Sequence, residues 1–287
     1  MEEKEFREWL SSYTDADKCM EAFKNRKKFF RVNTIKIGLE EFEKVSMLER
    51  KATKVKGAFE YLGEGIGRTF DYFLGYIHPQ SLSSIMVSEA LAPKAGEVVL
   101  DAAAAPGSKL THMAALMENK GAIVGIELKG HKLGPLFDNI SRLGVINACI
   151  IVGDSTKFKK RMFGKALVDA PCTALGSGGS AYLRWEPQHS KRISVLQEKM
   201  LLNAYDCLLD GGELVYSTCT YPPEENEKVV ARLLEEREGA SLIEVPLEGD
   251  GGISEYGKEM GKCRRIYPQQ NNSEGFFIAK VKKYGEG

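Results

Sequence analysis

The stretch Ala166-Leu-Val-Asp-Ala-Pro-Cys172 decides how the rest of the chain is interpreted. Its apolar run ends abruptly in Asp169, and a proline and a cysteine follow at once, which predicts a buried strand that presents polar groups at its carboxyl end. A second expected strand, Glu213-Leu-Val-Tyr216, ends in the same way, in Ser217-Thr-Cys219-Thr220. Because ligands of open α/β sheets bind at the carboxyl ends of the strands, we expect both cysteines to face one crevice.

Strand and helix patterns alternate around this stretch, from residue 78 to the end of the chain. We expect strands at 97–101, 122–127, 148–152, 165–169, 213–217, 241–245 and 275–282, with helices at 80–91, 108–118, 130–143, 187–209 and 223–237. Such alternation predicts an α/β fold in which a doubly wound, seven-stranded, Rossmann-like sheet carries helices on both faces.

The first 77 residues have a different pattern. Helices are expected around Phe6–Leu10, at 15–23 and at 39–48, and strands at Phe29–Val32 and Arg68–Phe73, with a glycine-rich turn region at 61–67. These short elements predict a small N-terminal α+β module at 1–77, followed by a larger catalytic domain at 78–287.

Composition limits the class of protein. The 287 residues are 43% hydrophobic, which is enough to bury a substantial core, and 40 basic residues balance 40 acidic ones. Net charge therefore does not indicate a nucleic-acid partner, although basic clusters at 24–31, 50–56, 157–161 and 262–265 would suit a phosphate backbone if they shared one face. Because the N-terminus lacks the apolar run of a signal peptide, we expect a cytoplasmic protein with no membrane segment.

The six cysteines do not form a recognisable metal or disulfide pattern. They include no Cys-x-x-Cys pair and have no histidine at ligand spacing, so neither a zinc site nor a disulfide framework is expected. Cys19, Cys149 and Cys207 lie in apolar patterns and are expected to be buried structural thiols.

A cofactor site is expected where the strand at 97–101 ends. Small residues follow it, so backbone N–H groups there can approach a ligand, and the helix that begins at 108 favours an anionic group. The Gly-x-Gly-x-x-Gly fingerprint is absent, and a tight turn without a ligand is the alternative.

Acidic residues strengthen the prediction of a cofactor. Asp101, Glu127, Asp154 and Asp169 end four consecutive strands, and Glu127 stands where an acid can accept the ribose hydroxyl protons. Asp154 is placed for the amino group of a base, so S-adenosyl-methionine fits the set. Lys132 is either a wall of the adenosine pocket or a solvated lysine. The candidate cofactor-binding residues are Ala103, Ala104, Ala105, Pro106, Gly107, Ser108, Lys109, Glu127, Lys132, Asp154 and Asp169.

Four motifs together resemble the Sun family of RNA 5-methylcytosine methyltransferases, and in particular its archaeal-type members that act on tRNA. The motifs are Asp101-Ala-Ala-Ala-Ala-Pro-Gly-Ser-Lys109, Asp169-Ala-Pro-Cys172-Thr-Ala-Leu-Gly176, Ser217-Thr-Cys219-Thr220 and Gly275-Phe-Phe-Ile-Ala279. The resemblance implies a methyltransferase sheet, S-adenosyl-methionine as cofactor, an RNA substrate, most closely tRNA, and an RNA-binding role for the N-terminal module. Ser108 and Ala174 depart from the family pattern, because glycine is usual at both positions.

The resemblance also implies catalytic roles. Carbon 5 of cytosine is a poor nucleophile, so a thiolate must first add to carbon 6, and the family gives this step to the position of Cys219. Cys172 is implied to release the product, Asp169 to hold ring nitrogen 3 when protonated, and Lys109 to orient the base and the cofactor. Neither His78 nor His112 is assigned a role.

Three other readings are open. An rRNA cytosine-5 methyltransferase would share the same motifs. A DNA cytosine methyltransferase has the motif Pro-Cys-Gln at its first cysteine, whereas this sequence has Pro171-Cys172-Thr173. A non-catalytic RNA-binding factor could retain the fold, but both cysteines, Asp169 and Lys109 are intact. We expect a monomer without a metal.

Overall fold

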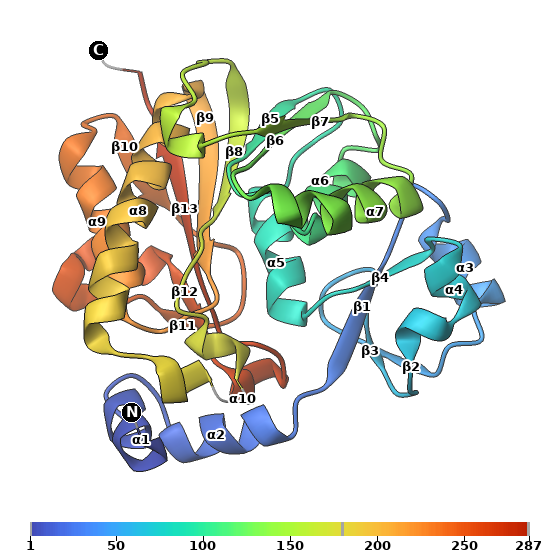
Figure 1. The fold of residues 1–287 in the computed structure, drawn as a ribbon, viewed down its shortest axis with the longest axis horizontal. Coiled ribbons are helices and arrows are strands. Elements are labelled where there is room, and N and C mark those ends of the chain that lie inside the picture. Colours follow the sequence, from blue (N-terminus) through green and yellow to red (C-terminus); the bar gives the residue numbers. More distant parts are fainter. Residues whose placement is uncertain (1, 179–180, 286–287) are drawn as a thin grey trace.

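The computed structural model describes residues 2–178 and 181–285, and two sheets organise them (Figure 1). Within those residues the large sheet has nine strands in the order β11-β12-β13-β9-β8-β5-β6-β7, and β10 pairs with β13. The strands are β5 Val98–Asp101, β6 Ala122–Glu127, β7 Ala148–Val152, β8 Phe163–Asp169, β9 Leu208–Thr218, β10 Ala240–Ile243, β11 Asp250–Gly251, β12 Arg264–Ile266 and β13 Phe276–Lys283.

The sheet is mixed. Strands β5 to β9 run parallel to one another, whereas β13 is antiparallel to β9 and extends the sheet toward β12 and β11. All seven strands expected from the sequence are present, and β11 and β12 are additional. They are two and three residues long, so neither contains enough residues for an alternating hydrophobic pattern to be recognised in the sequence.

Strand β8 lies near the middle of the sheet, between β5 and β9, and separates two cores. Leu167 packs into the core on one face, whereas its neighbours Ala166 and Val168 pack into the core on the other. This period of two, with apolar residues on both faces, explains why the strand is a continuous apolar run in the sequence.

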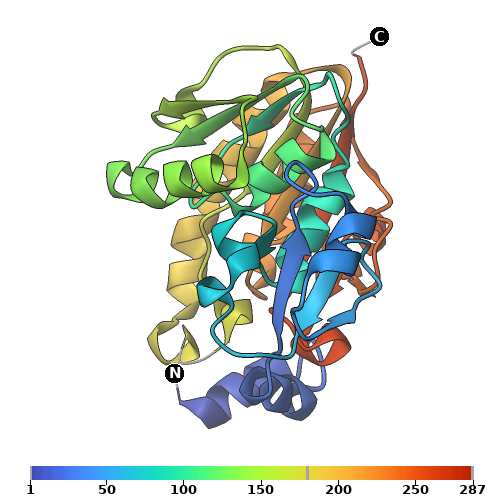
Figure 2. The same cartoon turned by 90° about the vertical axis from the view of Figure 1, so that its right-hand side faces the viewer.

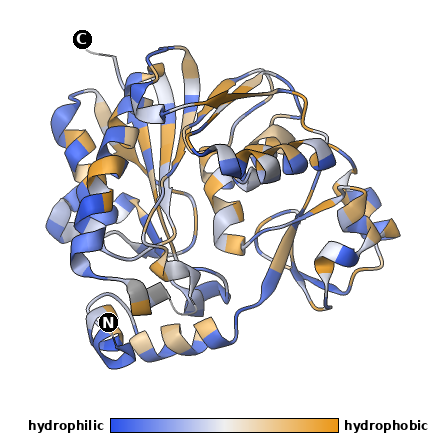
Figure 3. Ribbon diagram, viewed as in Figure 1, coloured by the Kyte–Doolittle hydropathy of each residue, from blue (hydrophilic) through white to orange (hydrophobic). Residues whose placement is uncertain are grey.

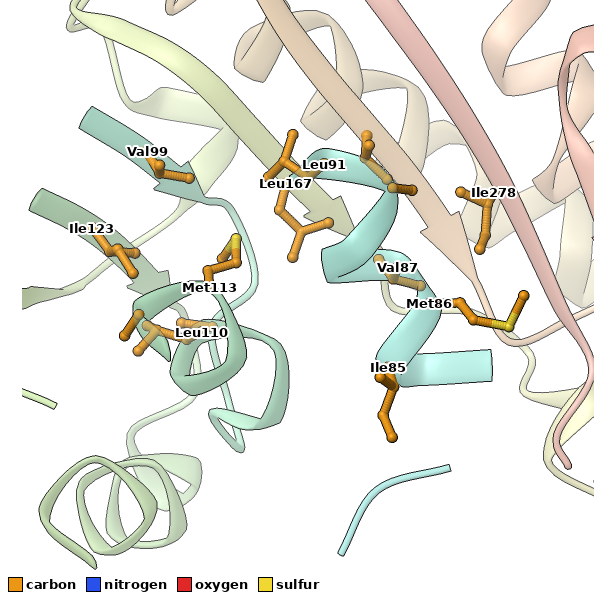
Figure 4. Packing of buried hydrophobic residues seen from close by; sticks show 14 of the residues in the cluster. Ile85, Met86, Val87, Leu91, Val99, Leu110, Met113, Ile123, Leu167 and Ile278 are labelled. Atoms are coloured by element: carbon orange, nitrogen blue, oxygen red, sulfur yellow. The ribbon is translucent and has the colours of Figure 1, made fainter. Parts of the chain in front are cut away.

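Helices cover both faces, as the doubly wound prediction requires. Figure 4 shows the first core, where α5, α6 and the strands meet. Helix α7 packs into that core as well, while α8 and α9 cover the opposite face. The helices are α5 Leu82–Leu91, α6 Ser108–Leu116, α7 Leu133–Leu143, α8 Pro187–Asp206, α9 Glu227–Glu236 and α10 Pro268–Asn271.

Helix α5 joins the two sheets. Nine of its ten residues are buried, because it contacts β8, β9 and β13 on one side and β1 of the N-terminal sheet on the other (Figure 1). Figure 3 shows hydrophobic colours along the central strands, whereas the outer helices carry both kinds of residue. Phe29 and Ala58 of the N-terminal sheet pack into the same core as the buried residues of α5. The core therefore continues from the large sheet into the N-terminal one.

The N-terminal sheet is antiparallel, in the order β2-β3-β1-β4. Its elements are β1 Lys28–Val32, α3 Leu39–Val45, β2 Arg50–Ala52, β3 Ala58–Tyr61, α4 Phe70–Phe73 and β4 Ile77–Pro79. The strand expected at Arg68–Phe73 is wrong: Arg68 ends the 3₁₀ turn η1 Ile66–Arg68, and Phe70–Phe73 form α4, which the Thr69 hydroxyl caps by accepting the Tyr72 N–H. The expected domain boundary after residue 77 falls within β4, and the division into 1–77 and 78–287 stays a prediction.

The first two helices lie apart from the N-terminal sheet, as Figure 2 shows. Helices α1 Glu3–Leu10 and α2 Ala16–Lys24 bury Phe6, Leu10 and Cys19 in an aromatic cluster with Trp185 and Tyr221, which belong to the large domain. The start of the chain thus supports the segment that follows Cys172.

Other helix predictions hold with shifted ends. The helix expected at 223–237 begins as the 3₁₀ turn η6 Pro223–Glu225, and α9 starts at Glu227. Cys19 and Cys207 are buried as expected, but Cys149 is exposed because β7 is the edge strand of the sheet. None of the described helices is long and apolar enough to cross a membrane.

Candidate active site

A cavity of about 420 Å³ opens at the carboxyl ends of β5, β6, β7 and β8. This volume lies within the range of small-molecule sites, which is about 300–1,000 Å³. Eight of the residues proposed from the sequence line it: Ala103, Ala105, Glu127, Lys132, Asp154, Asp169, Cys172 and Cys219. The strand ends therefore bring both cysteines and three of the four acids to one place.

The two cysteines meet just beyond the carboxyl ends of β8 and β9. Their sulfur atoms are 3.3 Å apart, within hydrogen-bonding distance for thiols. The loops that carry them are tied together, because the Gly176 N–H donates to the Cys219 carbonyl at 2.9 Å, and the Gly275 N–H donates to the Gly176 carbonyl at 2.8 Å. The pKa of Cys172 lies well above its usual value, owing to its hydrogen bond with Cys219 and to burial.

Asp169 and Lys109 form an ion pair beside the cysteines. Lys109 Nζ is 2.7 Å from Asp169 Oδ2, and the Ser217 hydroxyl donates to Asp169 Oδ1 at 2.8 Å. Burial alone would lower the pKa of Lys109, but the Asp169 carboxylate more than offsets this, so the pKa is raised and Lys109 stays a cation. The protonated form of Asp169, which holding ring nitrogen 3 would need, stays a prediction.

Glu127 forms the other end of the cavity. Although it is buried, its two carboxylate oxygens accept only backbone N–H groups, from Lys129 at 2.8 Å and from Ala105 at 3.3 Å. Each oxygen keeps a further lone pair for a ligand hydroxyl, which suits a ribose. The acceptor oxygens of Glu127 and the volume of the cavity therefore fit S-adenosyl-methionine.

Asp154 and Lys132 lie on the more open part of the wall. Asp154 Oδ1 accepts the Thr156 N–H at 3.0 Å and its hydroxyl at 2.7 Å, which fixes the carboxylate at the start of the 3₁₀ turn η3 Ser155–Lys157. Lys132 is exposed and lines the cavity.

The rest of the small-residue turn supports the site from behind. Ala104 is buried in the core, and the Pro106 carbonyl accepts the side-chain amide of Asn139. Gly107 has φ +99°, and a Cβ there would lie 2.9 Å from Leu136 Cδ1, so the turn needs glycine. Ser108, where the family pattern has glycine, hydrogen-bonds His78 Nε2 at 2.9 Å and does not line the cavity.

Several supporting residues were not found from the sequence. His78 contacts Ser108 and, at 3.0 Å, Arg142, and burial lowers its pKa well below the usual value. Asp101, which the sequence did single out, lies outside the cavity lining, and burial raises its pKa to about 7. Glu225 lies behind Cys172. In the sequence Glu225 stands in the polar stretch Pro222-Pro-Glu-Glu-Asn226, shortly after the Cys219 motif. This position could have indicated a role, but the residues that Glu225 contacts are distant in sequence.

Two arginines of the basic clusters do not face solvent. Arg31 is buried and donates to Gln80 and Thr111, and Arg265 is buried in an ion pair with Glu227. The expectation that these two arginines face a phosphate backbone is wrong. In the described part of the chain no group of three or more His, Cys, Asp and Glu side chains could hold a metal ion.

Comparisons with known proteins agree with this geometry. The family model described as 16S rRNA methyltransferase RsmB/F matches residues 88–282. The tRNA (cytosine(49)-C(5))-methyltransferase of Pyrococcus abyssi is 38% identical over 272 residues, which cover 88% of this chain and 87% of that protein. Ribosomal RNA small subunit methyltransferase F of Pectobacterium carotovorum is 34% identical over 279 residues, covering 88% of this chain but 56% of that protein.

Solved structures show the same fold. A methyltransferase homolog protein from Pyrococcus horikoshii superposes with a TM-score of 0.84 at 34% identity, covering 93% of this chain and 90% of that one. NSun6 from Pyrococcus horikoshii, solved with SFG, gives a TM-score of 0.88 at 25% identity and covers 98% of each chain. The similarity thus extends over both sheets.

Proposed function

Because the chain belongs to the RsmB/F family of RNA cytosine-C5 methyltransferases, we propose that it methylates cytosine in tRNA through a covalent bond to Cys219. The observation that carries the proposal is the pair of thiols 3.3 Å apart beside the Lys109–Asp169 ion pair. The choice of tRNA is supported by the Pyrococcus abyssi relative, which is similar over most of its own length and is named for a tRNA position. S-adenosyl-methionine supplies the methyl group as an electrophile when it is bound.

The first step is addition. Two thiols in contact cannot both ionise easily, and the Lys109 cation interacts electrostatically with Cys219, so we assign the thiolate to Cys219, whose proton passes to solvent. Its sulfur bonds carbon 6 of the flipped base, and the electrons of the C5–C6 double bond turn carbon 5 into a nucleophile. Lys109, held as a cation by Asp169, lies beside this site and stabilises the negative charge that develops on the ring.

Carbon 5 then takes the methyl group and carries both that group and its original hydrogen. Release requires a base for this hydrogen, and Cys172 is the nearest thiol to Cys219 in the cavity. Once the Cys219 sulfur is bonded to carbon 6, its negative charge no longer opposes ionisation of Cys172. Cys172 can then lose its proton to solvent and accept the carbon 5 proton, while the C5–C6 double bond re-forms and the Cys219 sulfur leaves.

The remaining residues bind and orient. Glu127 would accept the two ribose hydroxyls, Asp154 the amino group of the adenine, and the backbone of the turn at 103–108 would approach the rest of the cofactor. Lys132 would line the adenosine pocket. RNA binding by the module at 1–77 is part of the proposal, as the resemblance to the family implies. The target cytosine must leave the stack before carbon 6 becomes accessible.

A methylation assay tests the proposal. The purified chain is incubated with S-adenosyl-methionine and either in vitro transcribed tRNA or a small-subunit rRNA fragment, and 5-methylcytosine is located by bisulfite sequencing. The expected result is methylation of tRNA, with Cys219→Ala as the inactive control. Methylation of the rRNA alone would select the rRNA enzyme, to which the Pectobacterium relative points. S-adenosyl-methionine binding without methylation of either RNA would select the non-catalytic factor.

A further inference from the structure

A buried carboxylate that the mechanism above does not use lies behind the two cysteines. Glu225, the last residue of η6, is 0% exposed. Its oxygens accept the Thr173 N–H at 3.0 Å, the Thr173 hydroxyl at 2.6 Å and the side-chain amide of Gln197 at 3.1 Å. All three donors are neutral groups. A buried carboxylate held only by neutral donors is costly to keep, so it invites a functional explanation.

The contacts of Glu225 enclose the Cys172 position. Thr173 follows Cys172 directly, and Gln197, which donates to Glu225, also donates to the Pro171 carbonyl at 2.9 Å. Glu225 is thereby connected to the residues on both sides of Cys172. Since the backbone there has no regular secondary structure, these hydrogen bonds fix where the thiol lies.

The same network reaches the Cys219 loop. The Thr173 hydroxyl is 2.7 Å from the hydroxyl of Thr220, which follows Cys219 directly. The carbonyl of Glu225 accepts the Tyr216 hydroxyl at 2.6 Å, and Tyr216 lies on β9 just before Ser217. Glu225 therefore links the two cysteine-bearing segments: its carboxylate holds Thr173, which contacts Thr220, and its main-chain carbonyl holds Tyr216 on β9.

The charges around the thiols are asymmetric. The pKa of Cys172 is raised mainly by its hydrogen bond to Cys219 and by burial, and the negative charges of Cys219 and Glu225 raise it further. The cation Lys109, in contrast, interacts electrostatically with Cys219 and with Asp169. Tyr216 also lies near Cys172, with its pKa well above the usual value because of burial, so it adds no charge. A negative group thus lies on the Cys172 side and a positive group on the Cys219 side.

We propose that Glu225 is a positioning residue that seats Cys172 against Cys219 and, by its charge, assigns the thiolate to Cys219. The proposal deepens the proposed function and rests on it, because it explains how two adjacent thiols take different roles. Glu225 touches neither the substrate nor the reacting atoms and acts only through the Cys172 loop.

Glu225→Gln separates the charge from the shape. A glutamine keeps the size and one oxygen acceptor for Thr173, but removes the negative charge. The nearby Glu227 supplies a matched control: it is also 0% exposed, it pairs with Arg265 at 2.6 Å, and none of its contacts is to a cysteine loop residue 171–176. Glu227→Gln therefore tests the effect of losing a buried charge elsewhere in the same segment.

The first measurement needs no RNA. Each variant is alkylated with iodoacetamide over a pH series, and peptide mass spectrometry gives separate initial rates for Cys172 and Cys219. In the wild type we expect Cys219 to react first. In Glu225→Gln we expect Cys172 to react about tenfold faster at pH 8, with its pH profile displaced to lower pH, because one pKa unit changes the thiolate fraction tenfold. Glu227→Gln should keep the wild-type ratio of rates.

The second measurement uses tRNA and distinguishes the two proposals. Glu225→Gln should lower kcat about tenfold or more. The KM for tRNA and the KM for S-adenosyl-methionine should stay within about twofold of wild type, since only the thiols are disturbed. An unchanged ratio of alkylation rates in Glu225→Gln, or the same change in Glu227→Gln, would overturn the role of Glu225. If Glu225→Gln shifts the ratio of the Cys172 and Cys219 alkylation rates but the wild type methylates no RNA, the role of Glu225 stands and the proposed function is contradicted.

Discussion

The two ends of the cavity are built differently. At the β8–β9 end the functional side chains contact one another: Cys172 lies against Cys219, and Lys109 pairs with Asp169. At the β6–β7 end the carboxylates are held by separate groups: Glu127 accepts the N–H groups of Lys129 and Ala105, and Asp154 accepts the N–H and the hydroxyl of Thr156. Groups that contact one another influence each other's charge state, whereas Glu127 and Asp154 each have their own separate partners.

This difference separates chemistry from binding. Substitutions at the β8–β9 end should change the rate of the reaction, and their effects should not add, because the residues act as a unit. Substitutions at the β6–β7 end should change cofactor affinity alone, with smaller and separable effects.

The largest effect is expected for Cys219→Ser. A serine hydroxyl does not ionise near neutral pH, so addition to carbon 6 fails and kcat for tRNA methylation should fall roughly 10⁴-fold or more. The dissociation constant for S-adenosyl-methionine, measured by calorimetry, should stay within about twofold. A variant that kept a tenth of the activity would remove the distinction between the two ends.

Glu127→Gln should weaken cofactor binding without stopping the chemistry. A hydrogen bond to a charged group is worth about 1.5–3 kcal/mol, so the dissociation constant for S-adenosyl-methionine should rise about 10- to 100-fold. At saturating cofactor, kcat should recover to near the wild-type value. Glu97→Gln is the control, because Glu97 caps the Lys94 N–H at the opposite end of the sheet. Equal effects of the two substitutions would contradict the assignment.

Stability should depend on the charge of Asp101. Burial raises its pKa in the folded protein to about 7, above the unfolded value, so the stabilising contribution is present below about pH 4 and is lost as pH rises through 7. Asp101→Asn removes the cost of ionising a buried carboxyl group. The free energy of unfolding of the variant should therefore rise relative to that of the wild type by roughly 1–4 kcal/mol as the pH is raised from 4 to 8. Urea unfolding at the two pH values measures this gain. Parallel changes in both proteins would show that Asp101 is ionised at no cost.

The smallest effect is expected for Asp154→Asn. Asp154 is partly exposed, and an asparagine oxygen can still accept from Thr156, so only the charge is lost. The dissociation constant for the cofactor should rise about three- to tenfold, with kcat unchanged, as for a hydrogen bond worth about 0.5–1.5 kcal/mol. A fall in kcat comparable to that of Cys219→Ser would show that the two ends are not independent.

The sequence predicted the parallel strands well because β5, β6, β8 and the second half of β9 are largely buried apolar runs that end in a polar residue. Strand β7, at the edge of the sheet, is mostly exposed and was recognised by its apolar residues alone. Asp101, Glu127 and Asp169 end their strands as expected, so the topology of the sheet brings them together without further information. The cysteine pair followed from the same rule, since β8 and β9 are neighbours.

Other features depend on contacts that local patterns do not contain. Helices α1 and α2 read as part of the N-terminal module but pack on Trp185 and Tyr221. Arg31 and Arg265 read as surface charges, yet partners far along the chain bury them. Thr69 caps a helix in a segment with strand-like composition, and Glu225 reaches Thr173 across 52 residues. Side-chain partners distant in sequence decided each of these cases except that of Thr69, whose partner Tyr72 is only three residues away.

The division of labour between the two cysteines is tested most directly by trapping the covalent adduct. Wild type, Cys172→Ala and Cys219→Ala are each mixed with tRNA and S-adenosyl-methionine and run on a denaturing gel. If Cys219 attacks and Cys172 releases, Cys172→Ala alone accumulates a protein–RNA band that survives denaturation. A band that persists in Cys219→Ala and is lost in Cys172→Ala would exchange the two roles and contradict the account.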